Sequence, residues 1–94
     1  MLLYKLSKDA ILETFEDGAL VLLLGDRHLV ELNLSAAEIL SLLDGLRTPE
    51  QVADEIVKEH DISPDYPITQ VIQDVLELCR ELNRTGVLEL QSDH

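Results

Sequence analysis

The fold is decided where residues 30–40 read VELNLSAAEIL, because two different hydrophobic periods meet there. Val30 and Leu32 alternate with a polar residue, which is typical of a strand with one buried face. The apolar residues that follow keep a helical period, and Ser35 with Glu38 has the spacing of a capping box. We therefore expect a strand to end near Leu32 and a helix capped by Ser35 to begin directly after it.

Two more strands are expected before this point. The segments 11–16 and 19–24 are short, and Asp17-Gly18 between them is a strong turn signal. A second short turn leads to the third strand at 28–32, so the strands form an antiparallel meander. The middle strand is apolar throughout. Helices can cover one of its faces, and the other needs the N-terminal residues, a second protomer or a partner.

Three helices are expected downstream, at residues 35–45, 49–59 and 67–84. Thr48 and Gln51 form a second capping box, and Gly45 and Gly86 suit the ends of the first and third helices. A short strand-like segment follows at 87–90. The predicted fold is a winged-helix-like α+β domain, a three-stranded antiparallel meander followed by three helices.

The length of 94 residues predicts one domain, with residues 1–10 and 91–94 flexible. Cys79 is the only cysteine, so no internal disulfide is possible, which fits a reducing compartment. The N-terminus lacks the features of a signal peptide, and no apolar run is long enough to span a membrane. We expect a cytoplasmic protein.

The formal net charge is −12, and the 7 basic residues are scattered along the chain. Nucleic acids and anionic membranes are bound through clustered Lys and Arg, so neither is an expected partner. The histidines at 28, 60 and 94 lack metal-ligand spacing, and the glycines are isolated rather than gathered in a phosphate loop. Cys79 lies in the apolar stripe of the third helix. We expect no catalytic residue, no metal and no cofactor.

The ordered segments resemble the PqqD-like peptide chaperones, also called recognition elements of ribosomally made, modified peptides (RiPP recognition elements). The resemblance runs from about Ile11 to Leu90. The resemblance is carried by a strand ending in Leu-Asn, a capped helix, an Asp-Gly pair that ends this helix, and a later helix. In this chain these are Val30-Glu31-Leu32-Asn33, Ser35-Ala36-Ala37-Glu38-Ile39-Leu40, Leu43-Asp44-Gly45 with Thr48, and Asp74-Val75, Leu78, Leu82 and Gly86-Val87.

The resemblance implies a protein that holds the leader of a precursor peptide and presents it to a modifying enzyme, often a radical-SAM enzyme. The leader would add as a strand beside the third strand and pack against the third helix. The edge strand would be His28, Leu29, Val30, Glu31 and Leu32. The helix wall would be Ile72, Leu76, Cys79 and Asn83. Electrostatic contacts would come from Arg27, Arg80 and Arg84.

The residues themselves support such a site. A meander leaves its third strand with one unpaired edge, which is a template for strand addition. The third helix also carries more apolar residues than one core-facing stripe needs, and Ile72, Leu76 and Cys79 widen that stripe to one side. Two alternatives stay open. The same surface could serve a scaffold or dimerisation module of winged-helix type, including a homodimer. A divergent winged-helix regulator is disfavoured because Asp74, Glu77 and Glu81 on the third helix would repel DNA.

Overall fold

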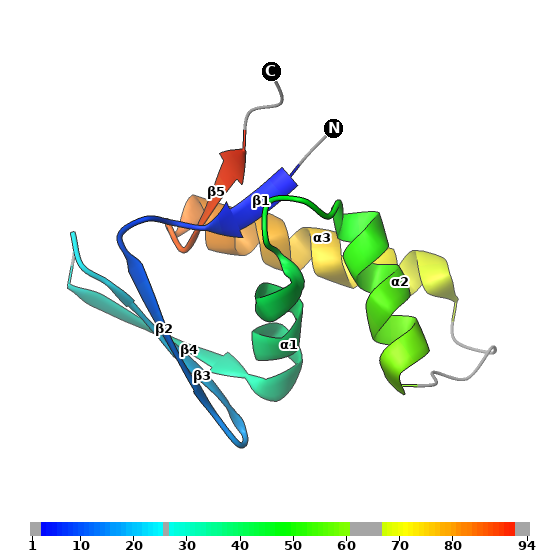
Figure 1. Cartoon of the computed structure of the whole chain (residues 1–94), viewed down its shortest axis with the longest axis horizontal. Helices are drawn as coiled ribbons and strands as arrows, with labels where there is room; N and C mark the ends of the chain where they lie inside the picture. Colours follow the sequence, from blue (N-terminus) through cyan, green and yellow to red (C-terminus); the bar gives the residue numbers. More distant parts are fainter. Residues whose placement is uncertain (1–2, 26, 61–66, 92–94) are drawn as a thin grey trace.

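The expected α+β fold is confirmed by a computed structural model that describes residues 3–25, 27–60 and 67–91. A three-stranded antiparallel sheet is followed by three helices, and a two-stranded ribbon joins the two ends of the described chain (Figure 1). In chain order the elements are β1 (Leu3–Leu6), β2 (Ala10–Phe15), β3 (Gly18–Leu23), β4 (His28–Asn33), α1 (Leu34–Leu42), α2 (Pro49–His60), α3 (Ile68–Arg84) and β5 (Leu88–Gln91).

The central strand of the three-stranded sheet is β3, which pairs with β2 on one side and β4 on the other. Ala19, Val21 and Leu23 of β3 are buried in the core, beneath α1. Gly18 begins the strand at a place where a Cβ atom would lie 2.3 Å from the backbone oxygen of Leu32. Only glycine fits there, because the strands approach closely.

Part of the segment expected to be flexible, residues 1–10, forms a strand, and residues 1–2 lie outside the described residues. β1 pairs antiparallel with β5 (Figure 1). Tyr4 of β1 is buried. The Tyr4 carbonyl also accepts a hydrogen bond from Gly45 N at 3.0 Å, with Gly45 in the left-handed region at φ 84°. This pairing joins the two ends of the chain, so no local pattern in the first ten residues reveals it. Gln91, also expected to be flexible, belongs to β5, whereas residues 92–94 lie outside the described residues.

The prediction that Ser35 caps the first helix was also wrong. The N-cap is Asn33, whose Oδ1 accepts a hydrogen bond from Ala36 N at 2.8 Å. An N-cap residue needs an extended backbone. Asn33 is the last residue of β4 and has that conformation, whereas Ser35 already lies in the first helical turn.

α1 ends at Leu42, three residues before the predicted end. Asp44 Oδ1 accepts hydrogen bonds from Leu46 N at 2.9 Å and Arg47 N at 3.3 Å. Such a local side-chain bond favours a turn over a continued helix.

The second capping box is confirmed. Thr48 Oγ1 accepts from Gln51 N at 3.2 Å, and Gln51 Oε1 accepts from Thr48 N at 2.8 Å. The reciprocal bonds satisfy two backbone donors at the start of α2. Pro49 occupies the first position of that helix, where a missing N–H costs nothing.

One hydrophobic cluster connects the sheet, the three helices and the terminal ribbon. α3 contributes the row Val71, Val75, Cys79 and Leu82 and packs mainly against α2 and β5. Gly86 ends this helix with a left-handed φ of 92°, as expected. No helix in the described part of the chain is both long enough and apolar enough to cross a membrane.

Candidate functional site

β4 is an edge strand of the meander, as predicted. Its residues pair with β3 on one side, and no strand among the described residues pairs with its other side. An unpaired strand edge presents backbone N–H and C=O groups to any extended segment that approaches. β2 forms the second edge of the same sheet, which the sequence reasoning did not consider.

The side chains of β4 divide between the two faces of the sheet. His28, Leu29 and Glu31 are exposed, Val30 is partly buried and Leu32 is buried in the core. Val30 and Leu32 pack inward beneath α1, so they hold the strand in place. The part of β4 that remains available to a ligand is therefore its backbone edge and its exposed side chains.

One side of α3 carries three of the four predicted wall residues. Ile72, Leu76 and Asn83 are all partly exposed, and the spacings of four and seven residues place them in one line along the helix. Ile72 packs against the buried cluster, whereas Leu76 is not among the residues packed there. Leu76 is thus the wall residue that contributes least to the packing of the core.

Cys79 does not belong to this wall. Its side chain has 0% exposure, and burial raises the pKa of its thiol to about 11. The spacing of Cys79 is compatible with both rows, since it lies four residues after Val75 and three after Leu76, and its burial assigns it to the buried row of α3. A buried, protonated thiol can neither contact a ligand at the surface nor act as a nucleophile.

Asn83 has a structural contact that the sequence did not reveal. Its Nδ2 donates a hydrogen bond to the backbone oxygen of Leu88 at 3.0 Å. The side chain therefore links α3 to the start of β5, and its Oδ1 is the atom left to accept a bond from a ligand.

The three arginines differ in their availability. Arg27 precedes β4 and has a left-handed backbone at φ 53°, with an exposed side chain. Arg84 is ion-paired with Glu81 on α3. Arg80 is exposed and forms no ion pair with any described residue. Of these three arginines, Arg27 and Arg80 offer an acidic ligand the less compensated positive charge.

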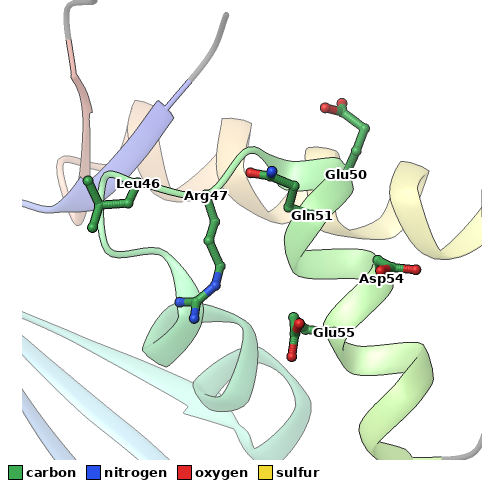
Figure 2. Close-up of a pocket in the computed structure, with 6 residues that line it drawn as sticks. All are labelled: Leu46, Arg47, Glu50, Gln51, Asp54 and Glu55. Atoms are coloured by element: carbon green, nitrogen blue, oxygen red, sulfur yellow. The ribbon is translucent and has the colours of Figure 1, made fainter.

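A cavity of about 500 Å³ lies away from these residues, between the loop after α1 and the first turns of α2 (Figure 2). Its side chains spread apart, with Leu46 and Glu50 pointing in different directions and Glu55 directed back towards α1. Arg47 is paired with Asp44 at 3.0 Å, and Asp54 is paired with Lys58 at 3.0 Å. Two of the charged side chains, those of Arg47 and Asp54, thus have local partners, and the charged groups do not converge on one point.

Metal ligands do not gather either. Within residues 3–25, 27–60 and 67–91, no three side chains of His, Cys, Asp or Glu lie close enough together to hold a metal ion. The structure does offer an open strand edge on the three-stranded sheet and a partly apolar flank on α3.

Comparison with known proteins gives a family and a fold. A family model described as coenzyme PQQ synthesis protein D (PqqD) matches residues 18–88. Among solved structures, the chain is similar to "TbiB1 in Complex with the TbiA(beta) Leader Peptide", with 25% identity, a TM-score of 0.78 and coverage of 95% of this chain and 99% of that one.

A "Lasso peptide synthetase B1 complexed with the leader peptide" is 21% identical, with a TM-score of 0.75 and coverage of 90% of this chain and 95% of that one. At this identity the likeness concerns the fold alone. No curated protein matches the chain.

Proposed function

The chain belongs to the PqqD family, and on this premise we propose that it is a non-catalytic protein that binds the leader of a ribosomally made precursor peptide. The leader would add as a strand to the free edge of β4. The observation that carries the proposal is this edge, which lies inside the segment that the family model matches. The similar TbiB1 structure, described as a complex with a leader peptide, supports the same reading.

Strand addition suits a surface such as β4 because the backbone supplies the bonds. Each main-chain hydrogen bond contributes about 0.5–1.5 kcal/mol net, whatever the side chains of the leader are. Side-chain pockets then provide selectivity. We propose that Ile72 and Leu76 of α3 form the apolar wall that receives the leader's aliphatic side chains, with Asn83 Oδ1 as an acceptor at its end.

Arg27 and Arg80 are the proposed electrostatic contacts of an acidic leader. Both are exposed, and Arg27 lies one residue before β4. Arg84 would contribute less, because its guanidinium already pairs with Glu81. Exposed charges mainly guide the encounter, so these contacts should affect the association rate more than the final affinity.

A leader-binding protein without catalytic groups needs an enzyme to act on the peptide. We propose that this chain presents the precursor to a modifying enzyme, and that the enzyme is a radical-SAM maturase. The support is the resemblance of the chain to PqqD-like chaperones. The lone cysteine suits a reducing compartment, and we propose the cytoplasm.

Calorimetry with synthetic peptides tests leader binding. The leader and the core halves of a candidate precursor peptide would be titrated separately into the protein. The proposal predicts one leader bound per chain and no binding of the core half. A core half that binds as tightly as the leader would contradict leader recognition.

The enzyme is tested separately, by measuring modification of the full precursor with and without this chain. The proposal predicts faster modification when the chain is present and no such gain when the leader is deleted. Equal rates with and without the chain would contradict the presenting role, even if the leader binds.

A protein–protein scaffold or dimerisation module is the second candidate function. It is favoured by three large apolar side chains that remain exposed on the three-stranded sheet, Ile11, Phe15 and Leu29. Sedimentation of the protein without peptide separates the candidates. A tight homodimer that does not bind the leader would support the scaffold function.

A further inference from the structure

The three-stranded sheet has a second face that α1 does not cover. Ala19, Val21 and Leu23 of β3 point into the core, so the alternate residues of each strand point the other way. The register places these outward residues in three cross-strand rows. We call them together the outer face; the rows are Ile11–Leu22–Leu29, Glu13–Leu20–Glu31 and Phe15–Gly18–Asn33.

The first row is aliphatic across all three strands. Ile11 is 46% exposed and Leu29 is 59% exposed, and Phe15 at the other end of the face is 53% exposed. Scattered exposed apolar residues are ordinary, but a contiguous row on one sheet face marks an interaction surface. In Figure 1 this sheet projects away from α2 and α3.

A hollow of about 180 Å³ opens towards the other end of the outer face. Its lining side chains include Phe15, Leu20 and Glu31 of the outer face and Asp17 of the adjoining turn. The hollow is thus bounded by an aromatic ring, an aliphatic side chain and two carboxylates. Gly18, Ala19 and Leu32 also line it, Gly18 with backbone alone and the other two as residues whose side chains belong to the core.

The chemistry of this hollow fits a cationic side chain. A guanidinium can stack on an aromatic ring and bond to carboxylates in its own plane. Neither Asp17 nor Glu31 forms an ion pair with any residue in the described part of the chain. The aliphatic stem of an arginine would rest against Leu20.

We propose that the outer face docks a partner protein that inserts one arginine into this hollow and lays aliphatic side chains on the row Ile11–Leu22–Leu29. Residues two apart on a strand are separated by about 6.6 Å, so the hollow lies roughly 10 Å from that row. A helix rises about 1.5 Å per residue, so about seven residues of a helical partner segment span this distance. The arginine and the aliphatic anchors would therefore recur on one face of the helix.

A second copy of the chain is a poor occupant of the same surface. The three rows of the outer face contain two glutamates and no basic residue. A second outer face would bring carboxylates rather than a cation to the hollow, and each copy carries a net charge of −12. Like charges across an interface are destabilising.

The outer face adjoins the proposed leader site, and the two share Leu29 and Glu31 of β4. Leader binding uses the backbone edge of β4, whereas the outer face uses side chains of all three strands. The two surfaces share β4, so a docked partner would lie beside a bound leader. The docking proposal does not depend on leader binding, and its test can be read separately.

The test uses two synthetic amphipathic helical peptides, one with leucines at positions i and i+3 and an arginine at i+7, the other with glutamate in place of that arginine. Each is titrated into the full chain, labelled with ¹⁵N, and followed by NMR. We expect the arginine peptide to shift the amides around Ile11, Phe15 and Leu29. We expect the glutamate peptide to bind at least about tenfold more weakly.

Three variants complete the test. Ile11→Glu and Phe15→Ala should each weaken binding of the arginine peptide by about tenfold or more. Leu46→Glu is the matched control: Leu46 is 79% exposed, lies outside the sheet and should leave binding unchanged. Thermal melts confirm folding. Phe15→Ala decides the outcome if Ile11→Glu fails to fold.

Several results would overturn the docking proposal. These are equal binding of the two peptides, shifts confined to the β4 edge or to α2, or no shifts at the outer face at about 1 mM peptide. A homodimer in sedimentation that Ile11→Glu dissolves would assign the face to a second copy instead. Calorimetry of the leader with the Phe15→Ala variant separates the two proposals. If this variant binds the leader with unchanged affinity, leader binding is supported independently of the result with the helical peptides.

Discussion

Asn33 Oδ1 accepts a hydrogen bond from the backbone N–H of Ala36 at 2.8 Å, so the last residue of the edge strand β4 is also the N-cap of α1. The cap fixes where the strand stops and the helix begins. Asn33→Ala should lower the free energy of unfolding by about 0.5–2 kcal/mol, because the Ala36 amide loses its acceptor. Urea melts measure this change.

Ser35→Ala is the control for that experiment. Ser35 is exposed and lies inside the first turn, so its loss should change the free energy of unfolding by no more than about 0.5 kcal/mol. A larger effect for Ser35→Ala than for Asn33→Ala would show that the helix is capped as the sequence first suggested.

Leu76 and Val75 are neighbours on α3 with opposite surroundings. Leu76 is partly exposed and Val75 is buried. Leu76→Ala should weaken leader binding by about 1–3 kcal/mol with little loss of stability. Val75→Ala should cost about 2 kcal/mol of stability and leave the affinity of the folded protein unchanged. Calorimetry and urea melts of both variants provide the two numbers. If Leu76→Ala loses stability and keeps its affinity, the leader does not use this flank.

Much of the fold follows from local signals in the sequence. The turn at Asp17-Gly18, the apolar strand after it and the box at Thr48 and Gln51 each depend on residues close in sequence, and each element lies within a residue or two of its predicted place. The exception among the helix ends is α1, where the Asp44 side chain forms a turn that competes with the helix.

The remainder depends on contacts that are distant in sequence. β1 is a strand because β5 offers it a partner at the other end of the chain, and the first residues carry no sign of that pairing. Cys79 was assigned to the groove wall because a helical stripe was drawn too wide. Its burial is set by the helix rotation that packing against α2 and β5 fixes. The hollow beside Gly18 needs three strands in register and could not be foreseen from any one of them.

His60 at the end of α2 contacts Glu38 of α1, with 2.5 Å between Nε2 and Oε2. The hydrogen bond to the Glu38 carboxylate and its negative charge raise the pKa of His60 above the ordinary value of 6.5. A raised folded-state pKa stabilises the fold fully below the unfolded pKa, and the contribution is lost as pH rises through the folded pKa. The contact should thus stabilise the fold at pH 5.5, and this contribution should be lost once the pH exceeds the raised pKa of His60.

NMR titration of the His60 ring measures this shift directly. Glu38→Gln should bring the pKa of His60 back towards its ordinary value and flatten this part of the stability profile. An unchanged His60 pKa in Glu38→Gln would show that the two side chains do not pair in solution.

Cys79 provides a chemical test of burial. Because burial raises the pKa of its thiol to about 11, iodoacetamide at pH 8 should label the native protein far more slowly than the protein in concentrated urea. Mass spectrometry follows the labelling with time. Equal rates in the two conditions would place Cys79 at the surface and return it to the groove wall.

The central claim is that the leader adds as a strand to the free edge of β4, and hydrogen exchange of the β4 amides with and without the synthetic leader tests it most directly. We predict that alternate amides of residues 28–33 exchange more slowly once the leader is bound, because only every second N–H points to the outer edge. Amides of the β2 edge should be unaffected. Protection confined to β2 or to α1, with β4 unchanged, would contradict strand addition at β4.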